Sequence, residues 1–277
     1  MSAVDAHVHV WDLSVRDQDW LSGPGLGPLR RTFTMDDLAP GARAAGVDRV
    51  VLVQTVTVAA ETPELLALAD RHELIAGVVG WTDLTRPDVA GELARLRELP
   101  GGRYLKGVRH QVQGEPDPRW LLRPDVRRGL AAVADAGLVH DLVVLPHQLP
   151  ACVEAAAALP GLTFVLDHLG KPPVASGELE PWASRVRALA ALPNTVCKLS
   201  GLVTQADPAT WQVRDLRPYA DVVLEAFGDG RLMFGSDWPV STLAAPYPDV
   251  VALADDLAGP HDRTRLFRTT AARVYGL

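Results

Sequence analysis

The sequence is poor in cysteine and contains no long apolar stretch. Its two cysteines, Cys152 and Cys197, lie in apolar surroundings and show neither a CxxC spacing nor the density of a disulfide scaffold. No run of about 18 apolar residues occurs, and the first segment, MSAVDAHVHVWD, has no basic region followed by an apolar one. We therefore expect a cytoplasmic protein with neither a membrane span nor an export signal.

Basic residues are also in the minority. The chain has 27 Lys and Arg against 34 Asp and Glu, a formal net charge of −7, and no block of basic residues. Binding to nucleic acid or to an anionic membrane depends on such positive charge, so neither is an expected partner. The remaining composition, 48% hydrophobic and 22% charged, is typical of a globular enzyme, and we expect a small-molecule substrate.

The length of 277 residues allows two small domains or one α/β barrel, which takes about 250 residues. No linker rich in Ser, Gly or Pro divides the chain. We therefore predict a single domain over residues 1–277.

Short apolar segments alternate with segments of helical periodicity along the whole chain. Eight strands are predicted, at Val4–Val10, Val47–Gln54, Leu74–Trp81, Tyr104–His110, Leu138–Leu145, Leu162–His168, Thr195–Ser200 and Arg231–Asp237. Eight helices are predicted between and after them, at Asp36–Ala45, Pro63–His72, Pro87–Leu99, Pro124–Ala136, Gln148–Leu159, Leu179–Leu192, Leu216–Phe227 and Asp249–Leu257. The strands recur at about the 30-residue spacing of a βαβ unit.

This pattern favours a (β/α)8 TIM barrel. The alternative is a doubly wound open sheet, which usually carries a glycine-rich phosphate loop after its first strand, and HVHVWD does not resemble GxGxxG. Two connections, from Trp11 to about Met35 and after the seventh strand, are longer than a barrel needs. Because both follow strands, we expect them at the C-terminal face, where barrel enzymes hold their active sites.

The first predicted strand carries alternating polar residues. Strand periodicity places Asp5, His7 and His9 on one face, so that two imidazoles point into the barrel near its mouth. Imidazoles so placed suit a divalent metal or an oxyanion. Two structural histidines with satisfied hydrogen bonds are the alternative.

Ionisable residues also lie at the ends of three later strands, in KGVRH, DHLGKP and FGSDWP. Burying such groups without partners costs several kcal/mol each, so packing alone does not explain them. We predict that they act together at one barrel mouth.

These motifs resemble a known family. HVHVWD, VVLVQT, GVVGWTDL, KGVRH, DHLGKP, KLSG and FGSDWPV occur in the order found in the amidohydrolase-related family of the amidohydrolase superfamily. The chain is most similar to its sugar-acid lactonase branch, which includes L-fuconolactonase and L-rhamnonolactonase and is related to 2-pyrone-4,6-dicarboxylate lactonase. The resemblance extends from Asp5 to Asp237 and into the final helix. It implies a TIM barrel that hydrolyses a lactone.

The resemblance also implies roles for individual residues. Asp237 matches the catalytic aspartate, the general base on water and then the proton carrier to the leaving oxygen. His7 and His9 match a pair that binds metal in most branches and polarises the substrate carbonyl in metal-free ones, and His168 matches a histidine close to that carbonyl. Five further residues are expected to bind substrate: Arg109, His110, Lys171, Trp81 and Trp238.

One departure from the family concerns the metal. Metal-dependent branches generally place a further ligand at the end of strand four or five, and here strand five ends in Leu145, with His140 and His147 nearby as expected structural histidines. His7, His9 and Asp237 remain as metal ligands, with His168 as an addition. The expectation is one divalent metal, zinc first, or none.

Other polar residues lie on the strands or just after them. Cys197 is expected to pack in the core. Lys198 and Ser200 share a strand face that could reach the barrel interior. A structural ion pair is the alternative to a functional role for these two residues. Gln54 and Glu61 follow strand two and suit either substrate hydroxyls or loop structure.

Other functions remain compatible with the motifs. A metal-dependent decarboxylase of the same superfamily, similar to aminocarboxymuconate-semialdehyde decarboxylase, would need a histidine at strand five. A phosphotriesterase-like hydrolase would need a bridging lysine, and Lys106 is the only lysine on strand four or five. A non-catalytic barrel that binds a sugar acid is the third alternative. The particular lactone stays open, as does the oligomeric state, for which a homodimer is one option.

Overall fold

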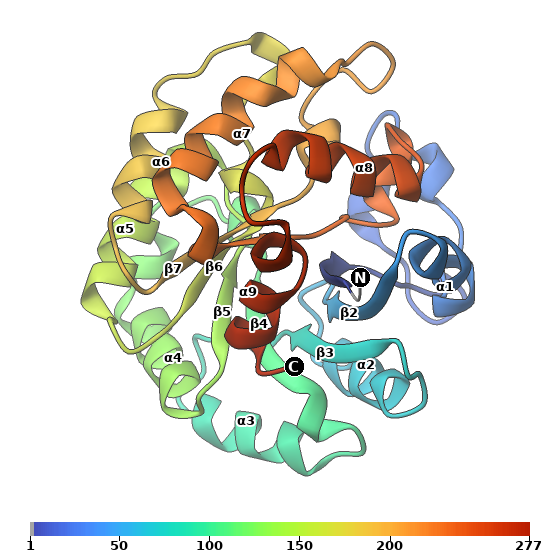
Figure 1. Ribbon diagram of the computed structural model, residues 1–277. Coiled ribbons are helices and arrows are strands. Elements are labelled where there is room, and N and C mark those ends of the chain that lie inside the picture. Colours follow the sequence, from blue (N-terminus) through green and yellow to red (C-terminus); the bar gives the residue numbers. More distant parts are fainter. Residues whose placement is uncertain (1–2) are drawn as a thin grey trace.

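Eight parallel strands form a ring at the centre of the computed structural model, which describes residues 3–277 (Figure 1). Each strand pairs with the next along the chain, and a bridge between Val8 and Trp238 joins the first strand to the segment after the last. The strands are β1 Ala3–Val8, β2 Val47–Val53, β3 Ile75–Gly80, β4 Leu105–His110, β5 Val139–Leu142, β6 Phe164–Leu166, β7 Thr195–Leu199 and β8 Leu232–Phe234. The predicted barrel is confirmed, and the open sheet is excluded.

A layer of helices surrounds the strands (Figure 1). All eight predicted helices are present: α1 Met35–Ala44, α2 Glu61–Ala69, α3 Val89–Glu98, α4 Pro124–Asp135, α5 Leu149–Ala158, α6 Trp182–Ala190, α7 Val213–Phe227 and α8 Tyr247–Ala258. A short further helix, α9 Thr270–Tyr275, was not predicted. Among the described residues, no helix combines the length and the apolar character needed to cross a bilayer.

Local sequence explains where several helices begin. Thr34 caps α1 by accepting a hydrogen bond from the Asp37 amide, and the Asp37 carboxylate accepts one from the Thr34 amide in return. Pro124 is the first residue of α4, a position whose amide has no partner within the helix, so the missing amide proton of proline costs no hydrogen bond.

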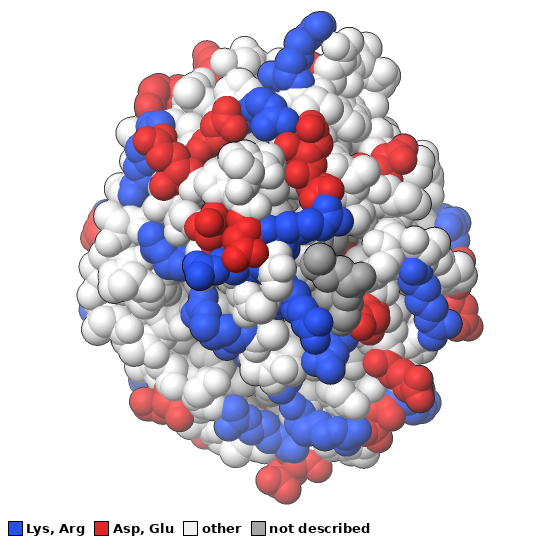
Figure 2. All heavy atoms as spheres, in the orientation of Figure 1, with Lys and Arg blue, Asp and Glu red and all other residues white. Residues whose placement is uncertain are grey.

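The core has two parts because strand residues alternate in direction. On β2, Val50 and Leu52 pack against the helices, whereas Val51 and Val53 pack inside the barrel. Tyr275 of α9 belongs to the interior cluster. In Figure 1, α9 lies over the middle of the barrel, and it closes the barrel at the N-terminal ends of the strands. Basic and acidic side chains are interspersed over this face (Figure 2).

Several strands end earlier than predicted. β6 ends at Leu166 and β8 at Phe234, while His168 and Asp237 have φ values of 52° and 59°. A strand cannot contain this left-handed backbone, so the chain leaves the sheet before these residues. The functional side chains therefore lie on turns at the mouth rather than on the strands themselves.

The prediction that Asp5 shares a face with His7 and His9 is wrong. The pairing of β1 with β2 changes register between Asp5 and Val8, and this irregularity breaks the alternation. The Asp5 carboxylate instead accepts hydrogen bonds from the Tyr247 hydroxyl of α8 (3.0 Å) and the Ser236 amide (2.8 Å). Burial raises the pKa of Asp5 to about 6.

Both long connections are present at the C-terminal ends of the strands. The one after β1 contains two short 3-10 helices, Asp19–Ser22 and Gly27–Leu29, and returns to its start through a bridge between Trp11 and Phe33. The one after β7 begins with a 3-10 helix, Leu202–Thr204.

Candidate active site

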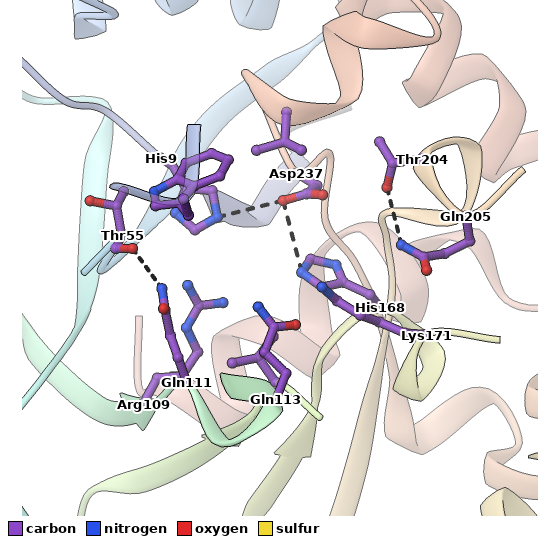
Figure 3. Close-up of a pocket in the computed structure, with 13 residues that line it drawn as sticks. His9, Thr55, Arg109, Gln111, Gln113, His168, Lys171, Thr204, Gln205 and Asp237 are labelled. Atoms are coloured by element: carbon purple, nitrogen blue, oxygen red, sulfur yellow. Dashed lines mark hydrogen bonds and ion pairs between the residues drawn. The ribbon is translucent and has the colours of Figure 1, made fainter. Parts of the chain in front are cut away.

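A pocket of about 140 Å³ opens at the C-terminal mouth of the barrel (Figure 3). The loop after β1 contributes Trp20 to its wall, and the loop after β7 contributes Thr204 and Gln205. The complete lining is His9, Trp20, Thr55, Arg109, Gln111, Gln113, Val143, His168, Lys171, Thr204, Gln205, Asp237 and Val240.

His7 lies on β1 and His9 directly follows this strand, and the two rings lie one beneath the other. Nδ1 of His9 lies 2.7 Å from the carbonyl oxygen of Val53, so Nδ1 carries a proton, and the neutral form of the ring has its lone pair on Nε2. That Nε2 lies 3.1 Å from Nε2 of His7, which is fully buried. His9 thus faces the pocket, and His7 supports it from below.

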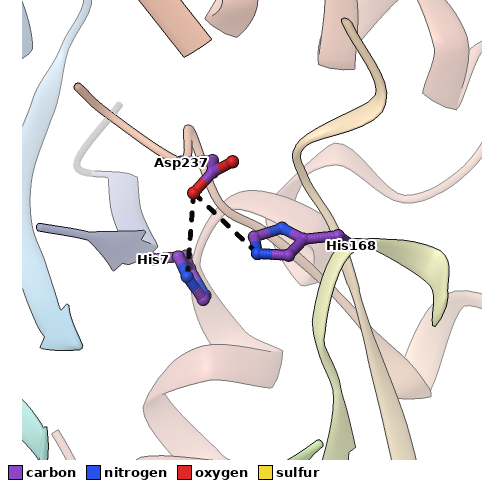
Figure 4. A group of neighbouring side chains, drawn as sticks. All are labelled: His7, His168 and Asp237. Carbon is purple, nitrogen blue, oxygen red and sulfur yellow. Dashed lines mark ion pairs between the residues drawn. The ribbon is translucent and has the colours of Figure 1, made fainter. Parts of the chain in front are cut away.

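Asp237 completes the group. Its Oδ1 lies 3.5 Å from Nε2 of His9, 3.9 Å from Nε2 of His7 and 3.8 Å from Nε2 of His168. Figures 3 and 4 show the three side chains of His7, His168 and His9 directed toward this oxygen. The closure of the barrel holds it there, because the Asp237 amide donates to the carbonyl oxygen of His7 at 2.9 Å. The structure thus brings Asp237 and the three histidines together at the mouth of the barrel.

The environment keeps Asp237 ionised. Burial alone raises the pKa of its carboxyl, but His168, His9 and His7 together lower it by more, and the pKa falls well below its usual range. Burial also lowers the pKa of His168 to about 4. At neutral pH the site therefore holds a carboxylate beside a neutral His168 imidazole.

Ser200, which directly follows β7, orients His168. The Ser200 hydroxyl oxygen accepts from the His168 amide at 3.3 Å and lies 2.9 Å from His168 Nδ1. Gly201 permits this approach, since it has a φ of 63° and a Cβ there would lie 2.7 Å from Nδ1. The KLSG motif thus supplies both the hydroxyl and the space.

A buried ionic network lies below the pocket. Lys198 reaches the barrel interior as expected, and its Nζ lies 2.6 Å from Asp141 and 3.0 Å from Asp167. Neither aspartate was predicted from the sequence as a site residue. Alternation with Val139, which faces the interior, was the signal that could have identified Asp141. Lys198 therefore forms an ion pair, which was the predicted alternative to a functional role.

Arg109 belongs to this network more than to the pocket. Its NH1 donates to Asp167 at 2.9 Å, and its NH2 donates to the carbonyl oxygen of Gln54 at 2.6 Å and to the Gln54 side chain at 3.1 Å. Its side chain is 4% exposed, so these contacts leave little of the guanidinium for a substrate. Lys171 lines the pocket and has no ion-pair partner among residues 3–277.

Three predicted substrate-binding residues lie outside the pocket wall. The indole of Trp81 donates to His110 Nδ1 at 3.1 Å, and His110 stacks on Trp120 with ring centroids 4.1 Å apart. Trp238 is buried against Phe33. A position at the end of a strand does not fix the direction of a ring, and these rings pack between the strands and the loops.

Most of the polar wall of the pocket was not predicted from the sequence. Gln111, Gln113, Thr204 and Gln205 line the pocket, and Oε1 of Gln113 is buried with no hydrogen-bond partner within the described chain. Gln111 and Gln113 directly follow the KGVRH motif with a spacing of two, which is the signal that could have found them.

The other polar candidates have structural surroundings. Glu61 accepts hydrogen bonds from the amides of Thr55 (2.9 Å) and Val56 (3.1 Å), so it orders the loop after β2. Burial raises the pKa of the Cys197 thiol. His140 is fully buried on the outer side of the barrel wall, beside Phe164, and His147 is exposed.

The donor atoms are close enough to share a metal ion. One ligand atom each from His7, His168 and Asp237 lies within 4.8 Å of the others (Figure 4), and His9 Nε2 adjoins this group. Ligands of a tetrahedral zinc ion with bonds of about 2.1 Å are about 3.4 Å apart. The separations of 3.1 to 3.9 Å among the His7, His9 and Asp237 atoms fit that spacing.

Known proteins resemble this chain over its whole length. The L-fucono-1,5-lactonase of Burkholderia multivorans is 40% identical over 99% of this chain and 96% of its own. That of Burkholderia ambifaria is 38% identical over 98% and 94%. A crystal structure of a Burkholderia multivorans amidohydrolase with bound zinc has a TM-score of 0.93 and 38% identity, with all of both chains covered.

The family model described as amidohydrolase matches residues 4–277. This match includes every motif on which the predicted resemblance rests. The chain belongs to the amidohydrolase family.

Proposed function

We propose that this protein hydrolyses the lactone of a sugar acid, with Asp237 as general base. The observation that carries the proposal is the ionised Asp237 among three imidazoles in a pocket at the barrel mouth. The two relatives named L-fucono-1,5-lactonase make L-fucono-1,5-lactone the first substrate to test.

The residues present can divide the chemistry among them. The Ser200 hydroxyl accepts from the His168 amide and can donate its own proton to His168 Nδ1, and the His168 proton then lies on Nε2, facing the pocket. This N–H can stabilise the carbonyl oxygen as it gains negative charge. Asp237 takes a proton from the attacking water and passes it to the ring oxygen, which leaves as a hydroxyl group.

One divalent metal, zinc first, fits the donors of His7, His9, His168 and Asp237. The Nδ1–H of His9 on the Val53 carbonyl is an arrangement common in metal-bound histidines. When bound, such a metal supplies Lewis-acid polarisation of the substrate carbonyl. His7 and His168 both set a condition on this binding, because the Nε2 of each ring must then offer a lone pair instead of a proton.

The pocket wall favours a neutral, hydroxylated substrate. Lys171 is the one cation of the described lining whose charge has no ion-pair partner, since Arg109 is engaged with Asp167. Gln111, Gln113 and Gln205 offer amide groups, which suit hydroxyls rather than carboxylates. A dicarboxylate would require more free positive charge than this wall presents.

A panel of lactones assayed by proton release tests the proposal. L-fucono-1,5-lactone and L-rhamnono-lactone are expected to be hydrolysed, and 2-pyrone-4,6-dicarboxylate is expected to be poor. Asp237→Asn is expected to lower kcat about 10³-fold, within the range for loss of a general base, without changing Tm. Asp36→Asn, at an exposed position on α1, is the matched control.

Two outcomes would overturn the proposal. The first is near-wild-type kcat in Asp237→Asn. The second is saturable binding of sugar acids with no turnover of any lactone, which would indicate a binding protein. Repeating the assay after chelation, and with zinc restored, tests the metal separately.

A further inference from the structure

The ammonium group of Lys198 lies inside the barrel directly below His7. Its Nζ is 2.6 Å from Asp141 Oδ2, 3.0 Å from Asp167 Oδ1 and 3.0 Å from His7 Nδ1. Lys198 and His7 are both fully buried, as are the two aspartates. An ammonium group has three protons and no lone pair, so it meets His7 only as a donor.

This contact favours one position for the proton of His7. Because Nδ1 accepts from Lys198, a neutral His7 ring has its proton on Nε2. The neighbouring His9 agrees with this assignment, since its Nε2 lone pair lies 3.1 Å from His7 Nε2. The hydrogen bonds then run in one direction, from Lys198 through His7 and His9 to the Val53 carbonyl.

The opposite tautomer of His7 is possible but meets two conflicts. A proton on Nδ1 could be donated to Asp167 Oδ1 at 3.3 Å, and Nε2 could accept from Arg109 at 3.2 Å. The same proton would face the Lys198 ammonium at 3.0 Å, and two lone pairs would face each other at 3.1 Å between His7 and His9. With the proton on Nε2, the conflict is instead with the Arg109 N–H at 3.2 Å. The shorter contacts, to Lys198 and His9, favour the proton on Nε2.

A metal reverses this preference. Ligation through His7 Nε2 needs a lone pair there, so the proton must move to Nδ1, where Lys198 donates. Asp167 Oδ1, 3.3 Å from Nδ1, can accept that proton beside the Lys198 ammonium, which lies 3.0 Å from the same oxygen. The site can therefore hold His7 with its proton on Nδ1, but the Lys198 ammonium beside Nδ1 opposes this tautomer.

We propose that Lys198 is a positioning residue that holds His7 as a hydrogen-bond donor toward the site and weakens metal binding there. The inference concerns the regulation of the site whose function is proposed above. Its tests are a zinc titration and a spectrum, which give a result whether or not a lactone is hydrolysed.

The first test measures zinc affinity of metal-stripped protein by calorimetry. Lys198→Met, which keeps the length of the side chain without its donors, is expected to bind zinc at least tenfold more tightly than wild type. Lys198→Met/Asp141→Asn removes one charge of each sign and gives the same expectation with a balanced interior. Lys106→Met, at a lysine that donates to the Gly276 carbonyl far from His7, is the control. Affinities of both Lys198 variants within twofold of wild type would overturn the proposal.

The second test observes the tautomer directly. Long-range ¹H–¹⁵N spectra of the metal-stripped wild type are expected to show His7 protonated on Nε2, with its signals assigned by their loss in His7→Gln. In Lys198→Met the proton is expected to shift toward Nδ1. A wild-type His7 protonated on Nδ1 would contradict the proposal, and this spectrum decides the matter even if neither Lys198 variant folds.

Discussion

The ring of His140 lies in the wall of the barrel. Both of its ring nitrogens are buried and lack hydrogen-bond partners within the described chain, and its ring meets Phe164 edge to face. Burial, with a smaller effect of His110, lowers the pKa of His140 to about 3. The folded protein therefore holds this residue neutral over a range in which the unfolded chain protonates it.

This difference predicts how stability depends on pH. Between the folded pKa of about 3 and the unfolded value of 6.5, the unfolded chain binds the extra proton, so the His140 contribution to stability is lost as pH falls below 6.5. The loss is at most about 1.4 kcal/mol per pH unit. His140→Leu is expected to remove this pH-dependent loss. The free energy of unfolding of the variant, measured in urea, is therefore expected to rise relative to that of wild type as the pH falls from 6 to 4.

The control for His140 is His147→Leu, since His147 lies in the same region but is exposed. This variant is expected to keep the wild-type pH dependence. A constant difference between His140→Leu and wild type across the range would show that His140 protonates as readily in the folded state as in the unfolded chain.

At the scale of elements, the loop after β1 shapes the pocket. Trp20 lies in its first 3-10 helix, lines the pocket and donates through its indole to Gln18 at 2.8 Å. Its ring also contacts Trp11, which donates to the carbonyl oxygen of Arg31. The loop thus presents an aromatic surface to the substrate while its own hydrogen bonds hold it in place.

Trp20→Ala is therefore expected to act on substrate binding rather than on the chemical step. Loss of the aromatic contact is expected to raise KM for the lactone about tenfold, equivalent to about 1.4 kcal/mol, with kcat within threefold of wild type. Trp211→Ala is the matched control, because Trp211 lies half-buried in the loop after β7 but outside the pocket wall. A fall in kcat with unchanged KM would place Trp20 in the catalytic step instead.

The elements were predictable from sequence to different degrees. Apolar periodicity gave the eight strands and eight helices, because burial on both faces leaves a clear pattern. It did not give strand ends such as His168 and Asp237, where the backbone turns left-handed. It also failed for Asp5, because a register change within one strand leaves no trace in the alternation. Alternation with Val139 could place Asp141 inside the barrel, but its contact with Lys198 depends on β5, β6 and β7 lying side by side, which no local pattern contains.

At the scale of the whole molecule, the barrel is closed both around its ring and at its base. The His9 amide donates to the Trp238 carbonyl oxygen at 2.7 Å, which joins the first strand to the last. Tyr275, from the end of the chain, donates to Asp141 at 2.9 Å inside the barrel. These contacts link the two ends of the sequence to the site, and they support our proposal that residues 1–277 form a single domain.

The net charge of −7 gives a test of the substrate class. A neutral lactone has no net Coulomb interaction with an acidic protein, so kcat/KM is expected to change less than twofold between 0.05 and 1 M salt, as the Debye length falls from above 10 Å to about 3 Å. The product is a carboxylate, which Lys171 can attract. Its inhibition constant is expected to rise several-fold over the same range, and Lys171→Met is expected to abolish most of that rise. A steep fall of kcat/KM with salt would instead indicate an anionic substrate and contradict the neutral lactone.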